Sequence, residues 1–278
     1  MCGVVWIDDR NGTEEQVCAP LVFLCASALE STRLLLLSGS ARSPGGLGAT
    51  SGVLGRYLMD HVFVRASGIG PPLRLPYCRD DDRSGVYLPR FDARDLPAPG
   101  AGRGFGVQFR HSTDKNSSYF SASCFGEMLP RPDNCVTLDP TRQDAWGIPV
   151  LHINCHHSEA ELLLAREQLS ALQELAEVVG VKLTNIDEVP CAPGSAIHEC
   201  GTARMGSDPA NSVLDPHNEC WEARGLFVTD GACFPSQGTQ NPTLTMLALT
   251  ARACEYATQT AHRAASKNCH PHLLDSKY

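Results

Sequence analysis

The sequence lacks any long apolar run and any excess of positive charge. No segment approaches the about 20 apolar residues needed to cross a bilayer, and residues 1–9 include neither a basic leader nor a long apolar stretch. The 23 Lys and Arg residues are outnumbered by 31 Asp and Glu, which gives a formal net charge of -8. We therefore expect a cytoplasmic protein with no membrane span and no nucleic-acid partner, whose substrate is a small neutral or cationic molecule.

The sequence also lacks paired metal-binding motifs. Its 13 cysteines include no C-x-x-C pair, which argues against a zinc knuckle or a regular disulfide framework and favours reduced, mostly buried thiols. His198 and Glu199 resemble the start of a metalloprotease helix, but Thr202 stands where the second histidine ligand would be. The His and Cys residues of 152–157 would split between the two faces of an alternating strand. We expect no metal site.

Apolar residues make up 42% of the chain, enough for a sizeable core. A hairpin over 4–18, a buried strand over 21–25 and a helix over 28–37 predict part of an α/β layer. Short alternating runs within 119–155 predict an antiparallel sheet, so the expected fold is α/β plus α+β. The other predicted elements are strands at 57–66, 106–109 and 226–229, a helix from the capping box of Ser158 and Glu161 to Gly180, a helix at 242–257, and surface connections at 42–52 and 80–101.

The carboxyl end of the last predicted strand is a place where chemistry could sit. Asp230 and Gly231 follow that strand, at the edge where open α/β sheets place ligands, although Asp-Gly after a strand is usually only a turn. Asn241 is a good N-cap for the final helix, Pro242 suits its first turn, and the unpaired N–H groups there attract negative charge. Taken alone, this segment is better explained as an ordinary capped helix.

Four segments, in order, resemble the C-terminal pattern of the glucose-methanol-choline (GMC) oxidoreductases. They are 198–206, 211–215, 225–235 and 241–252. Residues 27–39 are similar to that family's second signature region, with Thr32 where Pro is common, and 52–61 are similar to the segment that usually follows it. The resemblance covers most of the chain.

This resemblance implies a flavoenzyme site. It implies that His198 is the catalytic histidine and that Asn241 fills the second catalytic position. The FAD contacts that it implies are Asp230, Gly231, Pro242 and Thr243. A neutral histidine would take the hydroxyl proton while hydride passes to the flavin, Asn241 would hydrogen-bond the developing alkoxide, and the positive end of the final helix would face the reduced flavin. The form of the histidine motif with Glu199 favours a sugar or polyol as the alcohol substrate.

The motif with which such relatives begin is not found. A strand, a G-x-G-x-x-G turn and a helix should hold the ADP half of FAD, but the nearest run, 100–106, has Phe105 where the last glycine should fall. We expect the C-terminal portion of such an enzyme, with a missing N-terminal FAD-binding segment or chain as partner. It is either half of an enzyme that needs this segment or a catalytically silent fragment with a binding role. The expected domains are a partial FAD-binding domain (1–65), a substrate-binding domain (66–190), a return to the FAD-binding domain with the catalytic residues (191–265) and a tail (266–278).

Overall fold

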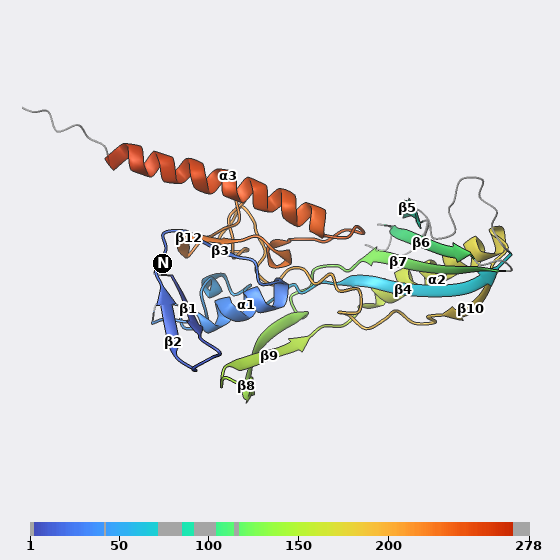
Figure 1. The fold of residues 1–278 in the computed structure, drawn as a ribbon, viewed down its shortest axis with the longest axis horizontal. Helices are drawn as coiled ribbons and strands as arrows, with labels where there is room; N and C mark the ends of the chain where they lie inside the picture. Colours follow the sequence, from blue (N-terminus) through green and yellow to red (C-terminus); the bar gives the residue numbers. More distant parts are fainter. Residues whose placement is uncertain (1–2, 42, 72–84, 92–103, 114–116, 269–278) are drawn as a thin grey trace, which may run out of the picture.

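The structure is a computed structural model that describes residues 3–41, 43–71, 85–91, 104–113 and 117–268. Figure 1 shows an elongated molecule with a small α/β layer towards one end and a larger antiparallel sheet towards the other. The strands are β1 (Val4–Ile7), β2 (Glu14–Val17), β3 (Val22–Leu24), β4 (His61–Gly70), β5 (Gly85–Phe91), β6 (Phe105–Thr113), β7 (Ser118–Glu127), β8 (Cys135–Gln143), β9 (Pro149–Asn154), β10 (Lys182–Ile186), β11 (Glu219–Cys220) and β12 (Ala223–Val228). The helices are α1 (Ala28–Leu37), α2 (Glu159–Val178) and α3 (Thr243–Asn268), with short 3-10 turns at Ala49–Ser51 and Gly231–Cys233.

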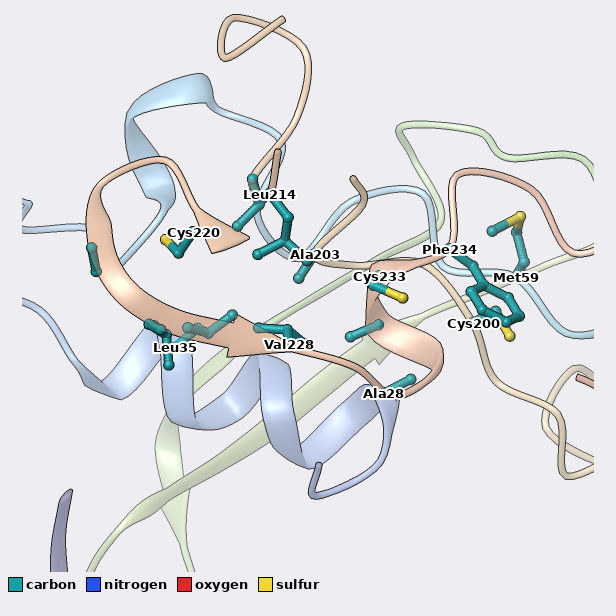
Figure 2. Close-up of a cluster of buried hydrophobic side chains, with 14 residues drawn as sticks. Ala28, Leu35, Met59, Cys200, Ala203, Leu214, Cys220, Val228, Cys233 and Phe234 are labelled. Carbon is teal, nitrogen blue, oxygen red and sulfur yellow. The ribbon is translucent and has the colours of Figure 1, made fainter. Parts of the chain in front are cut away.

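The α/β layer has β12 at its centre. The strand order is β11-β12-β3, and β12 runs parallel to β3. Successive side chains of a strand point to opposite faces, and on β12 they meet two different helices. Val228 joins the buried cluster that contains Leu35 of α1 (Figure 2), whereas Phe227 packs against Ala253 and Ala257 of α3. The small sheet is therefore covered by α1 on one face and by α3 on the other (Figure 1).

The larger sheet has the strand order β10-β4-β7-β6-β5, and all its neighbours are antiparallel. Helix α2 covers one face, where Leu164 and Leu172 pack with Val62 and Val64 of β4. The predicted antiparallel sheet is therefore present, but β8 and β9 form a separate hairpin instead of joining it. This separate hairpin is held against α1 by Arg33, which donates to the Pro149 carbonyl at 2.8 Å and to the Asp144 carboxylate at 2.7 Å.

Several predicted boundaries were right and others were wrong. The N-terminal hairpin, the helix at 28–37 and the capping box of Ser158 and Glu161 are confirmed. The strand predicted at 57–66 begins only at His61, because Tyr57 adopts a φ of 65°, which no strand residue has. Part of the predicted connection at 80–101 is instead the edge strand β5, the position in a sheet that tolerates its Pro89. Of the predicted tail, residues 269–278 lie outside the described residues.

Three further expectations concern burial and helix length. The strand predicted as buried, β3, lies at the edge of its sheet and leaves Phe23 36% exposed. The cysteines of the described residues are free thiols, but only Cys124, Cys200, Cys220 and Cys233 are buried, so the expectation of mostly buried thiols was wrong. Helix α3 extends well past the predicted end at 257. Among the helices that the structure describes, none has both the length and the apolar character of a membrane span.

Candidate functional site

The candidate site is organised by a short antiparallel pairing between two segments that are far apart in sequence. Met59 and Cys200 exchange backbone hydrogen bonds, both of 2.9 Å. In an antiparallel pair, moving two residues forward on one segment corresponds to moving two back on the other, so His61 lies opposite His198. The segments approach so closely that a Cβ on Gly201, which has a φ of 86°, would lie 2.1 Å from the Tyr57 carbonyl oxygen. Glycine is therefore required there.

The buried carboxylate of Asp60 holds the loop that carries His198. It accepts backbone N–H groups from Gly194 at 2.7 Å, Ala196 at 3.2 Å and His198 itself at 3.3 Å. Hydrogen bonds to a charged acceptor are stronger than those between neutral groups, so one side chain fixes three points of the loop. The Met59–Cys200 pairing and the Asp60 carboxylate together fix the position of His198.

A row of four side chains crosses from the core to the larger sheet. His198 Nδ1 lies 3.0 Å from His61 Nδ1, and His198 Nε2 lies 3.1 Å from Asn241 Nδ2. Asn241 Oδ1 accepts a 2.6 Å hydrogen bond from Gln108 Nε2 on β6. The Asn241 side chain is therefore directed at His198 and Gln108, and the expectation that it caps the final helix was wrong. Phe125 packs beside the His198 ring, with centroids 5.7 Å apart.

Both histidines are uncharged near neutral pH. Burial lowers the pKa of His198 below its usual value, and the nearby carboxylates of Asp60 and Glu199 only partly oppose this. For His61, burial first and the neighbouring His198 second lower the pKa to about 3, against a smaller opposing effect of the Gly238 backbone carbonyl. A neutral imidazole has one nitrogen with a lone pair, so His198 is able to accept a proton.

His198 and Asn241 line a cavity of about 260 Å³ under the larger sheet. The opposite wall presents polar side chains from β6 and β7, where Gln108 pairs with Ser123 and Arg110 pairs with Ser121 across the strands. A second hollow of about 490 Å³ shares Gln108, Arg110 and Asn241 and reaches the start of α3. A small polar molecule in the first cavity would thus lie between the sheet and the His198–Asn241 pair.

The other residues expected at the site lie at different distances from these cavities. Pro242 and Thr243 follow Asn241 directly, at the start of α3. Asp230 and Gly231 line neither cavity. The Asp230 carboxyl group accepts hydrogen bonds from Ser31 and from the Ala232 N–H, and burial raises its pKa. A Cβ on Gly231 would lie 2.5 Å from the Glu199 carbonyl oxygen. Glycine is therefore needed there because the backbone of Glu199 approaches so closely.

Three residues of the site were not singled out from the sequence: His61, Gln108 and Arg110. A signal existed for His61, because it ends the segment 52–61 that is similar to a family region. Gln108 and Arg110 sit two apart on β6 and so share one face of the sheet. Nothing in their local sequence indicates that this face looks onto a histidine.

The start of α3 suits an electron-rich flat ring. In the described part of the chain, the first intrahelical bond there runs from the Met246 N–H to the Pro242 carbonyl, and the N–H groups of Thr243, Leu244 and Thr245 reach no protein acceptor. Leu244 is 79% exposed beside them, and Ile197 is equally exposed next to His198. Free N–H donors beside exposed apolar side chains fit the electron-rich edge and the faces of a flavin.

Solved structures of oxidases share the fold of this chain. A solved structure concerned with FAD modification in formate oxidase of Aspergillus oryzae matches with a TM-score of 0.61 at 17% identity, covering 93% of this chain and 57% of that one. Residues 130–250 match the family model described as GMC oxidoreductase. This match identifies residues 130–250 as a segment of the GMC oxidoreductase family, whose cofactor is FAD, and the chain as a whole corresponds to the C-terminal portion of the relatives that it matches.

Named relatives agree with this placement. The chain is 32% identical over 279 residues to 2-methyl-1,2-propanediol dehydrogenase of Mycolicibacterium austroafricanum, covering 91% of this chain and 50% of the relative. It is 27% identical to the fructose dehydrogenase large subunit of Gluconobacter japonicus, covering 89% and 48% respectively. The chain thus spans about half the length of the curated relatives it matches.

Proposed function

We propose that this chain carries the substrate-facing residues of an enzyme that uses FAD to oxidise an alcohol group on a sugar or polyol. The observation that carries the proposal is the 3.1 Å contact between His198 Nε2 and Asn241 Nδ2 at the wall of a polar cavity. A base and a hydrogen-bond donor that meet at one point are what the oxidation of a hydroxyl group needs from a protein. Neither residue requires a metal for this role.

The residues of the chain act on the substrate oxygen. FAD, when bound, accepts the hydride that leaves the carbinol carbon. His198 takes the hydroxyl proton at Nε2, and Asn241 donates an N–H to the same oxygen as negative charge grows on it. The alcohol becomes a carbonyl compound, and the proton remains on His198. The free N–H groups at the start of α3, together with Pro242 and Thr243, would hold the electron-rich edge of the cofactor.

The cavity favours a substrate with several hydroxyl groups. Gln108, Ser121 and Ser123 offer both donors and acceptors, and Arg110 adds further donors. Within the described residues no carboxylate pairs with Arg110, so this wall suits a neutral polyol better than a cation. Fructose dehydrogenase, to which the chain is similar, is named for a sugar substrate, which supports the same choice.

An upstream FAD-binding segment, in the same chain or in a partner chain, is the second part of the proposal. The outer edge of β3 has no partner strand among the described residues. Leu21 and Phe23 at this edge are exposed apolar side chains, and α3 exposes Leu244 and Leu247. A parallel sheet is normally covered on both faces and continued at its edges, so these surfaces suit additional strands of the same layer.

The alternative is a catalytically silent fragment with a binding role. The direct contact of His198 with Asn241, and the hydrogen bonds that Asp60 and Gln108 make around them, favour the enzyme. A silent fragment has no need to hold a proton acceptor and an amide donor at the wall of one cavity.

The test is a titration of the purified chain with FAD, followed by anaerobic addition of sugars and polyols. We expect flavin binding and a loss of visible flavin absorbance with the correct substrate, and a much slower loss in His198→Ala. If the chain binds no flavin, the titration is repeated with the upstream FAD-binding half of a relative supplied as a separate chain. Flavin that binds but is reduced equally fast with and without His198 would contradict the catalytic role.

A further inference from the structure

His61 is buried beside His198 and has no part in the chemistry above. We propose that His61 is a positioning residue that keeps the single proton of neutral His198 on Nδ1, so that the lone pair of Nε2 faces the substrate cavity. The inference rests on the proposed role of His198 as the base. The position of the proton on His198 can be measured in the protein without flavin or turnover.

The first step is the orientation of Gln237. Its Nε2 donates a 2.6 Å hydrogen bond to the backbone carbonyl of His198, and since a carbonyl only accepts, this atom is the amide nitrogen. The same nitrogen lies 3.4 Å from His61 Nδ1. Because the amide nitrogen of Gln237 is a donor, His61 Nδ1 faces it with a lone pair. The proton of neutral His61 is therefore on Nε2.

The second step passes from His61 to His198. With a lone pair on His61 Nδ1, the 3.0 Å contact between the two Nδ1 atoms needs a hydrogen on the His198 side. A neutral imidazole has only one N–H, so His198 Nε2 is left as an acceptor. Asn241 Nδ2 donates to it, and Gln108 in turn donates to Asn241 Oδ1. All hydrogen bonds of the row therefore run in one direction, from the sheet towards the core.

The third step is the rigidity of His61. Its side chain is fully buried, and its ring meets Phe125 edge-on with centroids 5.5 Å apart. Within the described residues its Nε2 makes no hydrogen bond, although the Gly238 backbone carbonyl also acts on the ring. Reversing the row would turn an Nε2–H of His198 towards the Nδ2–H of Asn241, whose Oδ1 already accepts from Gln108, so that two donors would face each other. Burial thus keeps one arrangement of protons in place.

The test is nitrogen-15 NMR of the histidine side chains in this full chain at slightly alkaline pH, where His198 is neutral. We expect His198 to carry its proton on Nδ1. In His61→Phe, which removes the acceptor but keeps an aromatic ring beside Phe125, the form with the proton on Nε2 should change from minor to major. In His61→Gln, whose amide oxygen offers a new acceptor, the Nδ1–H form should be restored.

The control is His217→Phe, a change at a ring that stacks on Tyr256 and lines neither cavity. It should leave the His198 signals unchanged. An Nε2–H form of His198 in the wild-type chain would overturn the inference, and this spectrum needs no variant to fold. An unchanged Nδ1–H signal in a folded His61→Phe would also overturn it. Failure of flavin reduction would not alter the spectrum, so the two proposals stand or fall separately.

Discussion

The region around His198 and the edge of the α/β layer differ in how many of their contacts come from this chain. Around His198, the pairing of Met59 with Cys200 and the carboxylate of Asp60 give backbone groups of the loop partners from this chain. The α/β layer is different, because β3 has an open edge and α3 exposes Leu244 and Leu247 on its outer side. Under the proposed function, the chain would hold its reacting side chains by itself, and an upstream segment would complete the cofactor side.

The largest effect should come from the region around His198. His198→Ala in the flavin-loaded protein should slow flavin reduction by substrate about 10²- to 10⁴-fold, the usual contribution of a positioned base. Flavin affinity should stay the same, since the imidazole is held by His61 and Asn241 and not by the start of α3. Stopped-flow absorbance measures the rate. A loss of flavin binding instead would show that His198 helps to hold the cofactor.

The pairing around His198 should also be much less tolerant than a surface turn. Gly201→Ala puts a Cβ 2.1 Å from the Tyr57 carbonyl oxygen in addition to requiring a left-handed backbone. We expect a loss of about 3 kcal/mol or more in the free energy of unfolding. Gly180→Ala is the matched control, with a φ of 70° and nothing within 4 Å. It should cost only about 1 kcal/mol in the same denaturant titration.

Acid should lower the folding stability of the protein through protonation of His61. Its pKa is about 3 when folded against 6.5 in an open chain, so as the pH falls below 6.5 the unfolded state binds a proton first. Stability should therefore fall from pH 6.5 downwards, by about 2 kcal/mol at pH 5 from this group alone. His198 acts in the same direction, whereas Asp230, whose pKa is raised, acts in the opposite one.

The His61 contribution is isolated by comparison with His61→Phe. Unfolding curves of the two proteins at pH 7.5 and pH 5 should differ in their pH dependence by that amount. Equal pH dependence in both proteins would show that His61 is not buried in its neutral form.

The smallest effect on the chain itself should come from the open face of α3. Leu247 is 62% exposed, so Leu247→Ser should change the free energy of unfolding by less than about 0.5 kcal/mol. Leu249, on the same helix, packs against the main core, and Leu249→Ser should cost about 2 kcal/mol. If Leu247 faces an upstream segment, its serine variant should instead weaken binding of that segment, as measured by calorimetry. Equal unfolding costs at both positions would contradict an open face.

Local patterns predicted the elements whose boundaries are set locally. The helix at 28–37 was predicted with the bounds it has, and Ser158 with Glu161 marked the start of α2. The errors came from tertiary context. Sheet edges cannot be recognised from apolar runs, so β3 was expected to be buried, and β5 was missed because Pro89 interrupts its pattern.

The site was predictable only where a family pattern reached it. His198 and Asn241 were identified by resemblance, and the structure brings them into contact across 43 residues of sequence. Gln108 and His61 were not, since their contacts with Asn241 and His198 span 133 and 137 residues. No local propensity encodes which face of β6 looks onto a histidine, because this depends on how the larger sheet meets the Met59–Cys200 pairing.

The parallel pairing of β3 with β12 has a consequence for the order of folding. Cys25 and Thr229, at the ends of these strands, are 204 residues apart, and Phe23 stacks on Phe227 with ring centroids 5.0 Å apart. Contacts of such long range form slowly, because the loop between them must close before they are gained. During synthesis, β6 and β7 can pair as soon as both are made, whereas the β3–β12 pairing waits for β12, the last strand of the described residues. A ribosome that stops before β12 would therefore release a chain in which the edge of β3 that faces β12 is unpaired, a form prone to aggregation.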